Sequence, residues 1–241
     1  MNDASTQPRR RPGGTIAKRD LEFFWICDTS GSMAGRKIES LNFAMKEALG
    51  AMRERAHENP NADVFIRIAT FDDDARWITP ERMALEAFRW RDLKVDRGLT
   101  AMGAALDLVA CALEEAPEAA PSYPPVLVLT SDGMPTDTIP GLPTFAQGLK
   151  HILNTPLGRH AVRLAIAIGD EADLDVLAEF IGDPSLKPLR ARTAGELVNY
   201  VRWASSAGIV RSTTPKAGIS EQRLVVPTPI LPQDAGAEEL L

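Results

Sequence analysis

Two short runs of almost uninterrupted apolar residues, at positions 21–27 and 126–129, stand out in the sequence. A strand that is covered on both faces of a sheet has this pattern, because neither of its faces meets water. Helical patterns lie between and after these runs, so strands alternate with helices along the chain. This alternation predicts a doubly wound α/β fold, in which a mostly parallel sheet carries helices on both faces.

The other expected elements complete a six-stranded sheet. Helices are expected over residues 37–57, 102 to about 116, 145–153, 173–181 and 195–205, and further strands over 64–71, 162–168 and 189–192. Residues 76–78 are expected to form one antiparallel edge strand after an acidic turn at 72–74, which is interpreted as solvated rather than as a second metal site. For residues 79–97 the periodicity is mixed, which indicates a connection with at most a short helix.

Length and composition indicate one domain with two tails. The chain has 241 residues, of which 44% are hydrophobic and 25% are charged, as is usual for a soluble globular protein. Residues 1–19 are polar and basic, and we expect them to be a flexible leader. The domain is then expected over residues 20–210, and the Pro- and Ala-rich residues 211–241 are expected to form a disordered tail.

Charge and cysteine content restrict the setting in which the chain works. The net charge of −6 argues against generic nucleic-acid binding, which depends on basic patches. No apolar run approaches the roughly 20 residues that span a membrane. Cys27 and Cys111 both lie in apolar patterns, so we expect two buried thiols in a reducing compartment and a cytoplasmic location.

Polar side chains gather where the predicted strands end. Asp28, Ser30 and Ser32 follow the first buried strand, and Asp132 follows the second. Thr100 lies just before the predicted helix that precedes this second strand. The carboxyl ends of parallel strands meet at one edge of the sheet, so these side chains are expected to lie close together. Oxygen ligands of this kind suit Mg²⁺.

In order and spacing these five residues resemble the metal-ion-dependent adhesion site of the von Willebrand factor A domain family, written DxSxS with a distant threonine and a distant aspartate. The resemblance extends over about residues 21–206. The segments DTSGSMAGRKIESLN, SDGMPTD and AIAIGDEADLDVLAEFIGD look like the bacterial branch associated with tellurium-resistance and stress operons. Leu99 is a departure, because many relatives have glycine before the threonine.

The resemblance implies a non-enzymatic module that binds a protein partner through Mg²⁺ or Mn²⁺. It implies that the hydroxyls of Ser30, Ser32 and Thr100 face the metal, and that Asp28 and Asp132 act through ordered waters. Because neutral hydroxyls leave most of the metal charge uncompensated, a Glu or Asp of the partner is expected at the open position. Relatives of this kind occur beside a serine/threonine kinase and a metal-dependent serine/threonine phosphatase, which makes these candidate partners in a bacterial stress-response or phospho-signalling complex.

Two other functions are open at this point. A Mg²⁺-dependent phosphohydrolase would use Asp28 as nucleophile, although Ser30 occupies the place where such enzymes generally carry a second aspartate as general acid. The chain is alternatively a scaffold with a vestigial metal site. The three histidines have no Cys or carboxylate at ligand spacing in the sequence, and surface positions are expected for them: His57, His151 and His160.

Overall fold

A computed structural model describes residues 18–95, 98–115 and 122–213, so the predicted leader and tail lie almost entirely outside the described residues. The strands are β1 (Arg19–Asp28), β2 (Ala62–Phe71), β3 (Ala75–Trp77), β4 (Met83–Ala84), β5 (Val126–Ser131), β6 (Val162–Ile168) and β7 (Leu189–Ala191). The α-helices are α1 (Arg36–His57), α2 (Met102–Glu114), α3 (Phe145–Asn154), α4 (Leu174–Ile181) and α5 (Ala194–Thr213). Two 3₁₀ turns, Gly31–Met33 and Gly158–His160, complete the described elements.

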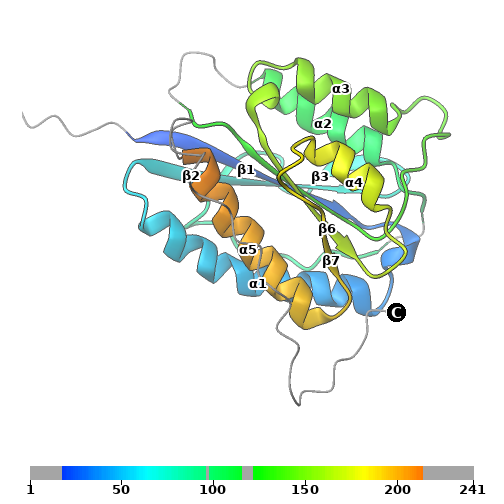
Figure 1. The fold of residues 1–241 in the computed structure, drawn as a ribbon, viewed down its shortest axis with the longest axis horizontal. Helices are drawn as coiled ribbons and strands as arrows, with labels where there is room; N and C mark the ends of the chain where they lie inside the picture. Colours follow the sequence, from blue (N-terminus) through cyan, green and yellow to red (C-terminus); the bar gives the residue numbers. More distant parts are fainter. Residues whose placement is uncertain (1–17, 96–97, 116–121, 214–241) are drawn as a thin grey trace, which may run out of the picture.

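The strands form a single mixed sheet in the order β3-β2-β1-β5-β6-β7 (Figure 1). β1 pairs in parallel with β2 on one side and with β5 on the other. The strand order therefore reverses between β1 and β5, which is the switch point where ligands bind in sheets of this type. The predicted doubly wound α/β class is confirmed, and the two apolar runs become the two strands beside the switch point.

The predicted strand count needs a correction, because the sheet has seven strands and not six. β4 pairs antiparallel with β2 at Phe65 and Ile66, further along the edge on which β3 also pairs antiparallel. Both residues of β4 are exposed, so it carries no apolar alternation that predicts a strand. No helix forms between residues 79 and 95, the described part of the ambiguous segment.

Helices cover both faces of the sheet (Figure 1). α1 and α5 lie side by side on one face, and α2 and α3 lie side by side on the other. α4 packs against β6. It belongs to the face of α2 and α3, because the crossovers from β5 to β6 and from β6 to β7 run in the same direction and are right-handed.

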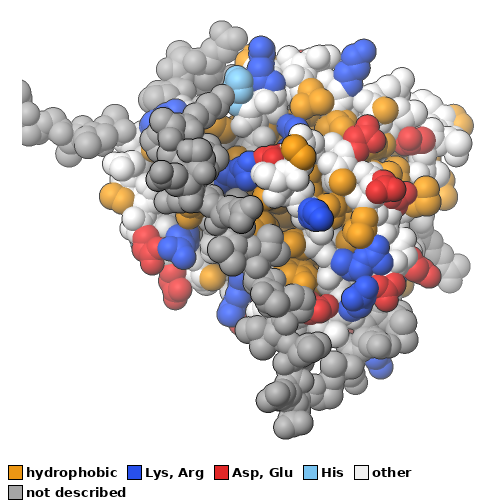
Figure 2. All heavy atoms as spheres, viewed as in Figure 1, with side chains coloured by type: hydrophobic (Ala, Val, Ile, Leu, Met, Phe, Trp, Pro, Cys, Tyr) orange, Lys and Arg blue, Asp and Glu red, His pale blue; other side chains and the backbone are white. Residues whose placement is uncertain are grey.

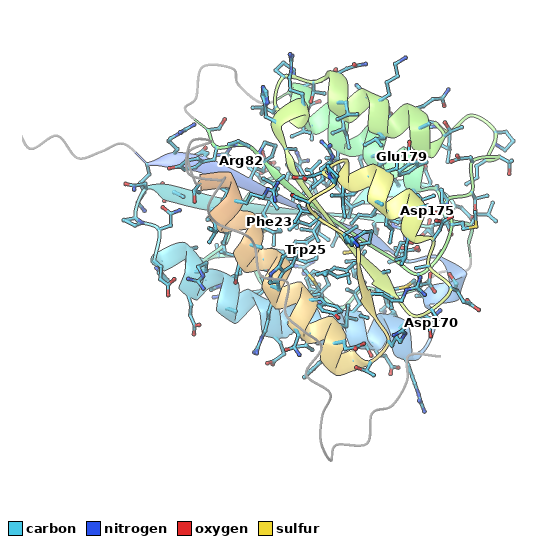
Figure 3. The ribbon with its side chains drawn as sticks, viewed as in Figure 1. Phe23, Trp25, Arg82, Asp170, Asp175 and Glu179 are labelled. Carbon is cyan, nitrogen blue, oxygen red and sulfur yellow. The ribbon has the colours of Figure 1, made fainter. Side chains whose placement is uncertain are left out.

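Helix α5 packs against aromatic side chains of β1. Phe23 and Trp25 are buried with their rings 5.8 Å apart, and both lie under this helix (Figure 3). A Cβ atom added to Gly208 would lie 2.6 Å from Val126 and 2.9 Å from the Phe23 ring, so the helix backbone touches the sheet directly. α5 continues to Thr213, beyond the predicted helix end at 205 and the predicted domain end at 210.

The two cysteines differ in environment, which corrects the expectation that both are buried. Cys27 lies in the core on β1, whereas Cys111 is exposed on α2. The core-facing side of α2 is formed by neighbours such as Leu106 and Val109, and Cys111 falls on the other side. None of the helices in the described residues combines the length and the hydropathy that crossing a membrane requires. Charged side chains of both signs are interspersed on the face shown in Figure 2.

Candidate metal centre

The five predicted site residues come together at the carboxyl edge of the sheet, on both sides of the switch point. Asp28 is the last residue of β1, and Asp132 directly follows β5. Four of the five are at most 8% exposed, and Ser32 alone is exposed. The structure thus places side chains 100 residues apart in contact, as the strand pattern predicts: Ser32 Oγ donates to Asp132 Oδ1 at 2.8 Å.

Asp28 is held by hydrogen bonds to both of its carboxylate oxygens. The Ser30 amide donates to Oδ1 at 2.8 Å, and the Ser131 hydroxyl donates to Oδ2 at 2.6 Å. Burial raises the pKa of Asp28 to about 6, against the opposing effect of these hydrogen bonds and with a further contribution from Asp132. A cation placed beside this carboxyl group would favour its ionised form.

The two serines present their hydroxyls next to one another. Ser30 Oγ and Ser32 Oγ are 3.1 Å apart. Adjacent ligands in an octahedron with bonds of 2.0–2.1 Å are separated by about 3 Å, so this spacing fits two neighbouring ligands of Mg²⁺. Because the Ser32 hydroxyl proton points to Asp132, a lone pair of the same oxygen is free to face a cation.

Thr100 is held in place by contacts between its loop and three other loops. Gly31 N donates to Gly98 O at 3.2 Å, which joins the DxSxS loop to the Thr100 loop. Thr136 N donates to Thr100 O at 2.8 Å, which joins it to the loop after β5. The Thr100 hydroxyl oxygen lies 4.0 Å from the position that a Cβ atom would take on Gly133. It therefore faces the segment that carries Asp132.

The third contact of this loop is the acidic turn after β2, in which Asp73 and Asp74 are exposed, as expected of a solvated turn, whereas Asp72 is buried. Asp73 Oδ1 accepts a hydrogen bond from Leu99 N at 2.8 Å, and Asp72 O accepts one from Ala101 N at 2.8 Å. Asp72 is buried, and its carboxylate pairs with Arg76 at 2.6 Å. The turn therefore positions the residues on both sides of Thr100, while Arg76 neutralises its buried charge.

Lys37 is a member of this cluster that sequence reasoning missed. Its ammonium group lies 2.7 Å from Asp132 Oδ2, and the Lys37 side chain is 10% exposed. It comes from the first turn of α1, which follows the DxSxS loop directly. A lysine near a helix start usually points into solvent, so no signal in the sequence distinguishes it. Asp132 thus has a hydroxyl on one oxygen and an ammonium group on the other.

Two apolar side chains stand exposed close to the cluster in sequence. Leu99 precedes Thr100 and is 49% exposed, and Met134 follows Asp132 by two residues and is 63% exposed. Most large apolar side chains of the described residues are buried. Leu99 and Met134 are called the apolar rim below.

Comparison with known proteins supports the family resemblance. Residues 23–134 match the family model of the von Willebrand factor type A domain. The chain has the von Willebrand factor type A fold. The mostly parallel sheet with helices matches a von Willebrand factor type A protein from Catenulispora acidiphila, with a TM-score of 0.60 and 17% identity over 80% of this chain and 43% of that one.

Other solved structures share this fold. The ArnB paralog VWA2 from Sulfolobus acidocaldarius matches with a TM-score of 0.55 and 14% identity, over 78% of this chain and 45% of that one. Proximal thread matrix protein 1 from the mussel byssus, solved with a zinc-occupied MIDAS motif, matches with a TM-score of 0.54 and 13% identity, over 80% and 47%. The chain spans less than half the length of each of these three proteins. No curated protein sequence matched the chain.

Proposed function

We propose that this chain is a non-enzymatic protein-binding module that engages an acidic side chain of its partner through a divalent cation. The observation that carries the proposal is the cluster of Asp28, Ser30, Ser32, Thr100 and Asp132 at the switch point of a von Willebrand factor type A fold. The zinc-occupied MIDAS motif of the mussel protein shows that a protein of this fold can bind a divalent metal, which supports the proposal.

The hydroxyls of Ser30, Ser32 and Thr100 would hold the cation, and Asp28 and Asp132 would act on it through water. Both carboxylates already accept hydrogen bonds on each oxygen, which favours this division. Mg²⁺ or Mn²⁺ is the expected ion, because hydroxyl and carboxylate oxygens suit both and Mg²⁺ usually retains several waters. When bound, the ion would supply an exchangeable position for an outside oxygen.

Charge balance favours an acidic partner. The buried Asp28, Asp132 and Lys37 side chains leave one net negative charge, since Asp72 is neutralised by Arg76. A divalent cation would turn this into one net positive charge in a mostly buried site, and a partner's carboxylate would cancel it. The apolar rim of Leu99 and Met134 would add apolar contact beside that carboxylate. The buried core of a protein interface is usually more apolar than the rest of the surface.

Binding fits the geometry of Asp28 better than phosphohydrolase chemistry does. A nucleophilic aspartate needs an oxygen that is free to attack phosphorus. Asp28 is fully buried, and its oxygens accept hydrogen bonds from Ser30 and Ser131. We therefore expect no turnover of a generic phosphoester in the presence of Mg²⁺; activity that disappears in Asp28→Asn would overturn this choice.

The cellular setting in this proposal rests on the resemblance to the tellurium-resistance and stress-operon branch. It places the module in the bacterial cytoplasm, in a complex with a serine/threonine kinase and a metal-dependent phosphatase. Affinity purification from native cells with divalent metal retained tests it. Recovery of a kinase or phosphatase that is lost on adding a chelator and lost in Asp28→Ala is expected, and recovery that survives both changes would rule out a metal bridge.

A further inference from the structure

A second cluster of metal-ligating side chains lies between α2 and α3. Asp107 and Cys111 are four residues apart on α2, and His151 on α3 faces them. One ligand atom from each of these three residues lies within 4.8 Å of the other two. No sequence spacing connects His151 with a Cys or carboxylate, but helix packing brings it next to Asp107, which is 44 positions away.

His151 is oriented by carboxylates on both of its ring nitrogens. Asp107 Oδ1 lies 2.7 Å from Nδ1, and Glu114 Oε1 lies 3.2 Å from Nε2. In many metal sites, a histidine ligand binds the metal through one nitrogen and donates its other N–H to a carboxylate. Glu114 is placed to accept from Nε2, which leaves Nδ1 directed at Asp107.

We propose that Asp107, Cys111 and His151 form a binding site for a thiophilic divalent cation such as Zn²⁺, with Glu114 orienting the imidazole. A thiolate, an imidazole and a carboxylate are the three ligand types that Zn²⁺ takes in proteins. Its bond lengths place tetrahedral ligands about 3.3–3.8 Å apart. The 2.7 Å between His151 Nδ1 and Asp107 Oδ1 is shorter than this range, so these two atoms would move apart as a cation replaces the proton between them. Their side chains, which are 29% exposed at His151 and 41% at Asp107, have room to do so.

The two helices that carry this site are held at a fixed separation. A Cβ atom on Gly148 would lie 2.3 Å from Gly103 O, so the helix backbones touch at this point. Asp107 lies one turn beyond Gly103, and His151 lies about one turn beyond Gly148. Contact between the backbones therefore fixes the separation of the two helices before a metal arrives, which lowers the ordering cost of binding.

This cation site is separate from the proposed partner-binding site in place and in chemistry. The proposed partner-binding site offers only oxygen ligands and suits Mg²⁺ or Mn²⁺, whereas a thiolate selects softer metals. The two proposed sites can therefore be tested separately by the choice of metal ion.

Titration of the reduced full chain with Co²⁺, in excess Mg²⁺, tests the proposal. Co²⁺ stands in for Zn²⁺, and its bond to a thiolate gives an intense near-ultraviolet charge-transfer band. We expect this band at one Co²⁺ per chain, its loss on adding Zn²⁺, and its absence in Cys111→Ser. His151→Gln and Asp107→Asn should weaken Zn²⁺ binding on the order of tenfold or more, and Glu114→Gln by about tenfold.

His57→Gln is the matched control, because His57 lies on α1, on the other face of the sheet, and has Glu86 as its acidic neighbour at 3.5 Å. It should leave Zn²⁺ binding unchanged. The substituted side chains are at least partly exposed, so each variant is expected to fold. Circular dichroism in chelator checks this. The absence of a band in the wild type, or a Zn²⁺ affinity equal to that of the wild type in both His151→Gln and Asp107→Asn, would overturn the site.

Discussion

Lys37 and Asp132 form a buried ion pair at the carboxyl edge of the sheet. Their ion pair spans 2.7 Å, with the Lys37 side chain 10% exposed and the Asp132 carboxylate fully buried. A buried pair of this kind costs much when one partner is removed, because the other charge remains in a poorly solvated place.

We predict that Lys37→Met lowers the free energy of unfolding of the metal-free protein by about 3 kcal/mol. The same change should tighten Mg²⁺ binding, because it removes a positive charge beside the cation. Urea denaturation in chelator measures the first effect, and calorimetric titration measures the second.

Lys46→Met is the control for this prediction. Lys46 lies on the same helix and pairs with Asp92 at 2.6 Å, but its side chain is 49% exposed. An exposed pair contributes at most about 1 kcal/mol. Equal losses of stability in the two variants would show that the Lys37 pair has no special role.

Other site residues were predictable because a pattern identified them. Asp28, Ser30, Ser32 and Asp132 each follow a strand whose apolar run is unmistakable, and strand ends share one edge in parallel sheets. Thr100 depended on the family resemblance, since a single threonine in a loop has no pattern of its own. Lys37 could not be predicted as a site residue, because its role depends on the direction of a long, flexible side chain, and sequence periodicity does not indicate that direction.

At the scale of elements, the contact between α2 and α3 is tight at two glycines. Added Cβ atoms would lie 2.3 Å from backbone atoms at both Gly103 and Gly148. Helix α3 begins with a capping box in which Thr144 and Gln147 exchange hydrogen bonds, so its first turn is fixed as well. The pair of helices has little freedom to separate.

We predict that Gly148→Ala lowers the free energy of unfolding by about 2 kcal/mol, because the new methyl group must push the helices apart. The same shift would separate Asp107 from His151 and weaken the Co²⁺ band. Thermal or urea unfolding and the Co²⁺ titration measure the two consequences.

Gly50→Ala is the matched control on α1. Nothing lies within 4 Å of the Cβ atom that this substitution adds. Alanine is a better helix former than glycine, so stability should rise by up to about 1 kcal/mol. If Gly148→Ala also raised stability, the close contact between α2 and α3 would be absent in solution.

Sequence patterns predicted the elements whose side chains are buried in the core. They did not predict an element that forms only through backbone hydrogen bonds to a neighbouring strand. β6 was predicted at its observed bounds, because all but its first two residues are buried. β4 was not predicted, because two exposed residues form it through pairing with the edge of β2. The last two turns of α5 were missed because small residues around Gly208 obscure the helical period, although that glycine is what lets the helix touch the sheet.

At the scale of the whole molecule, the topology explains why the oxygen-bearing residues meet. β1 connects to β2 on one side, whereas the later strands are added on the other side, beginning with β5. The loops that leave β1 and β5 therefore diverge at the switch point, and the side chains that follow the two strands face a common space. The loops that carry Thr100 and the acidic turn close this space from the side of β2.

The most direct test of the central claim is a titration with Mn²⁺, in which electron paramagnetic resonance measures the free ion. Acetate is added to stand in for the partner's carboxylate, and Mn²⁺ is chosen because it prefers oxygen ligands to thiolate. Ser32→Ala removes one proposed ligand, and Ser185→Ala, at an exposed turn after α4, is the control.

We predict one Mn²⁺ per chain, bound more tightly with acetate present, with affinity reduced on the order of tenfold or more in Ser32→Ala and unchanged in Ser185→Ala. Absence of Mn²⁺ binding in acetate, or equal affinity in the wild type and Ser32→Ala, would contradict a metal-bridged binding site at the carboxyl edge of the sheet.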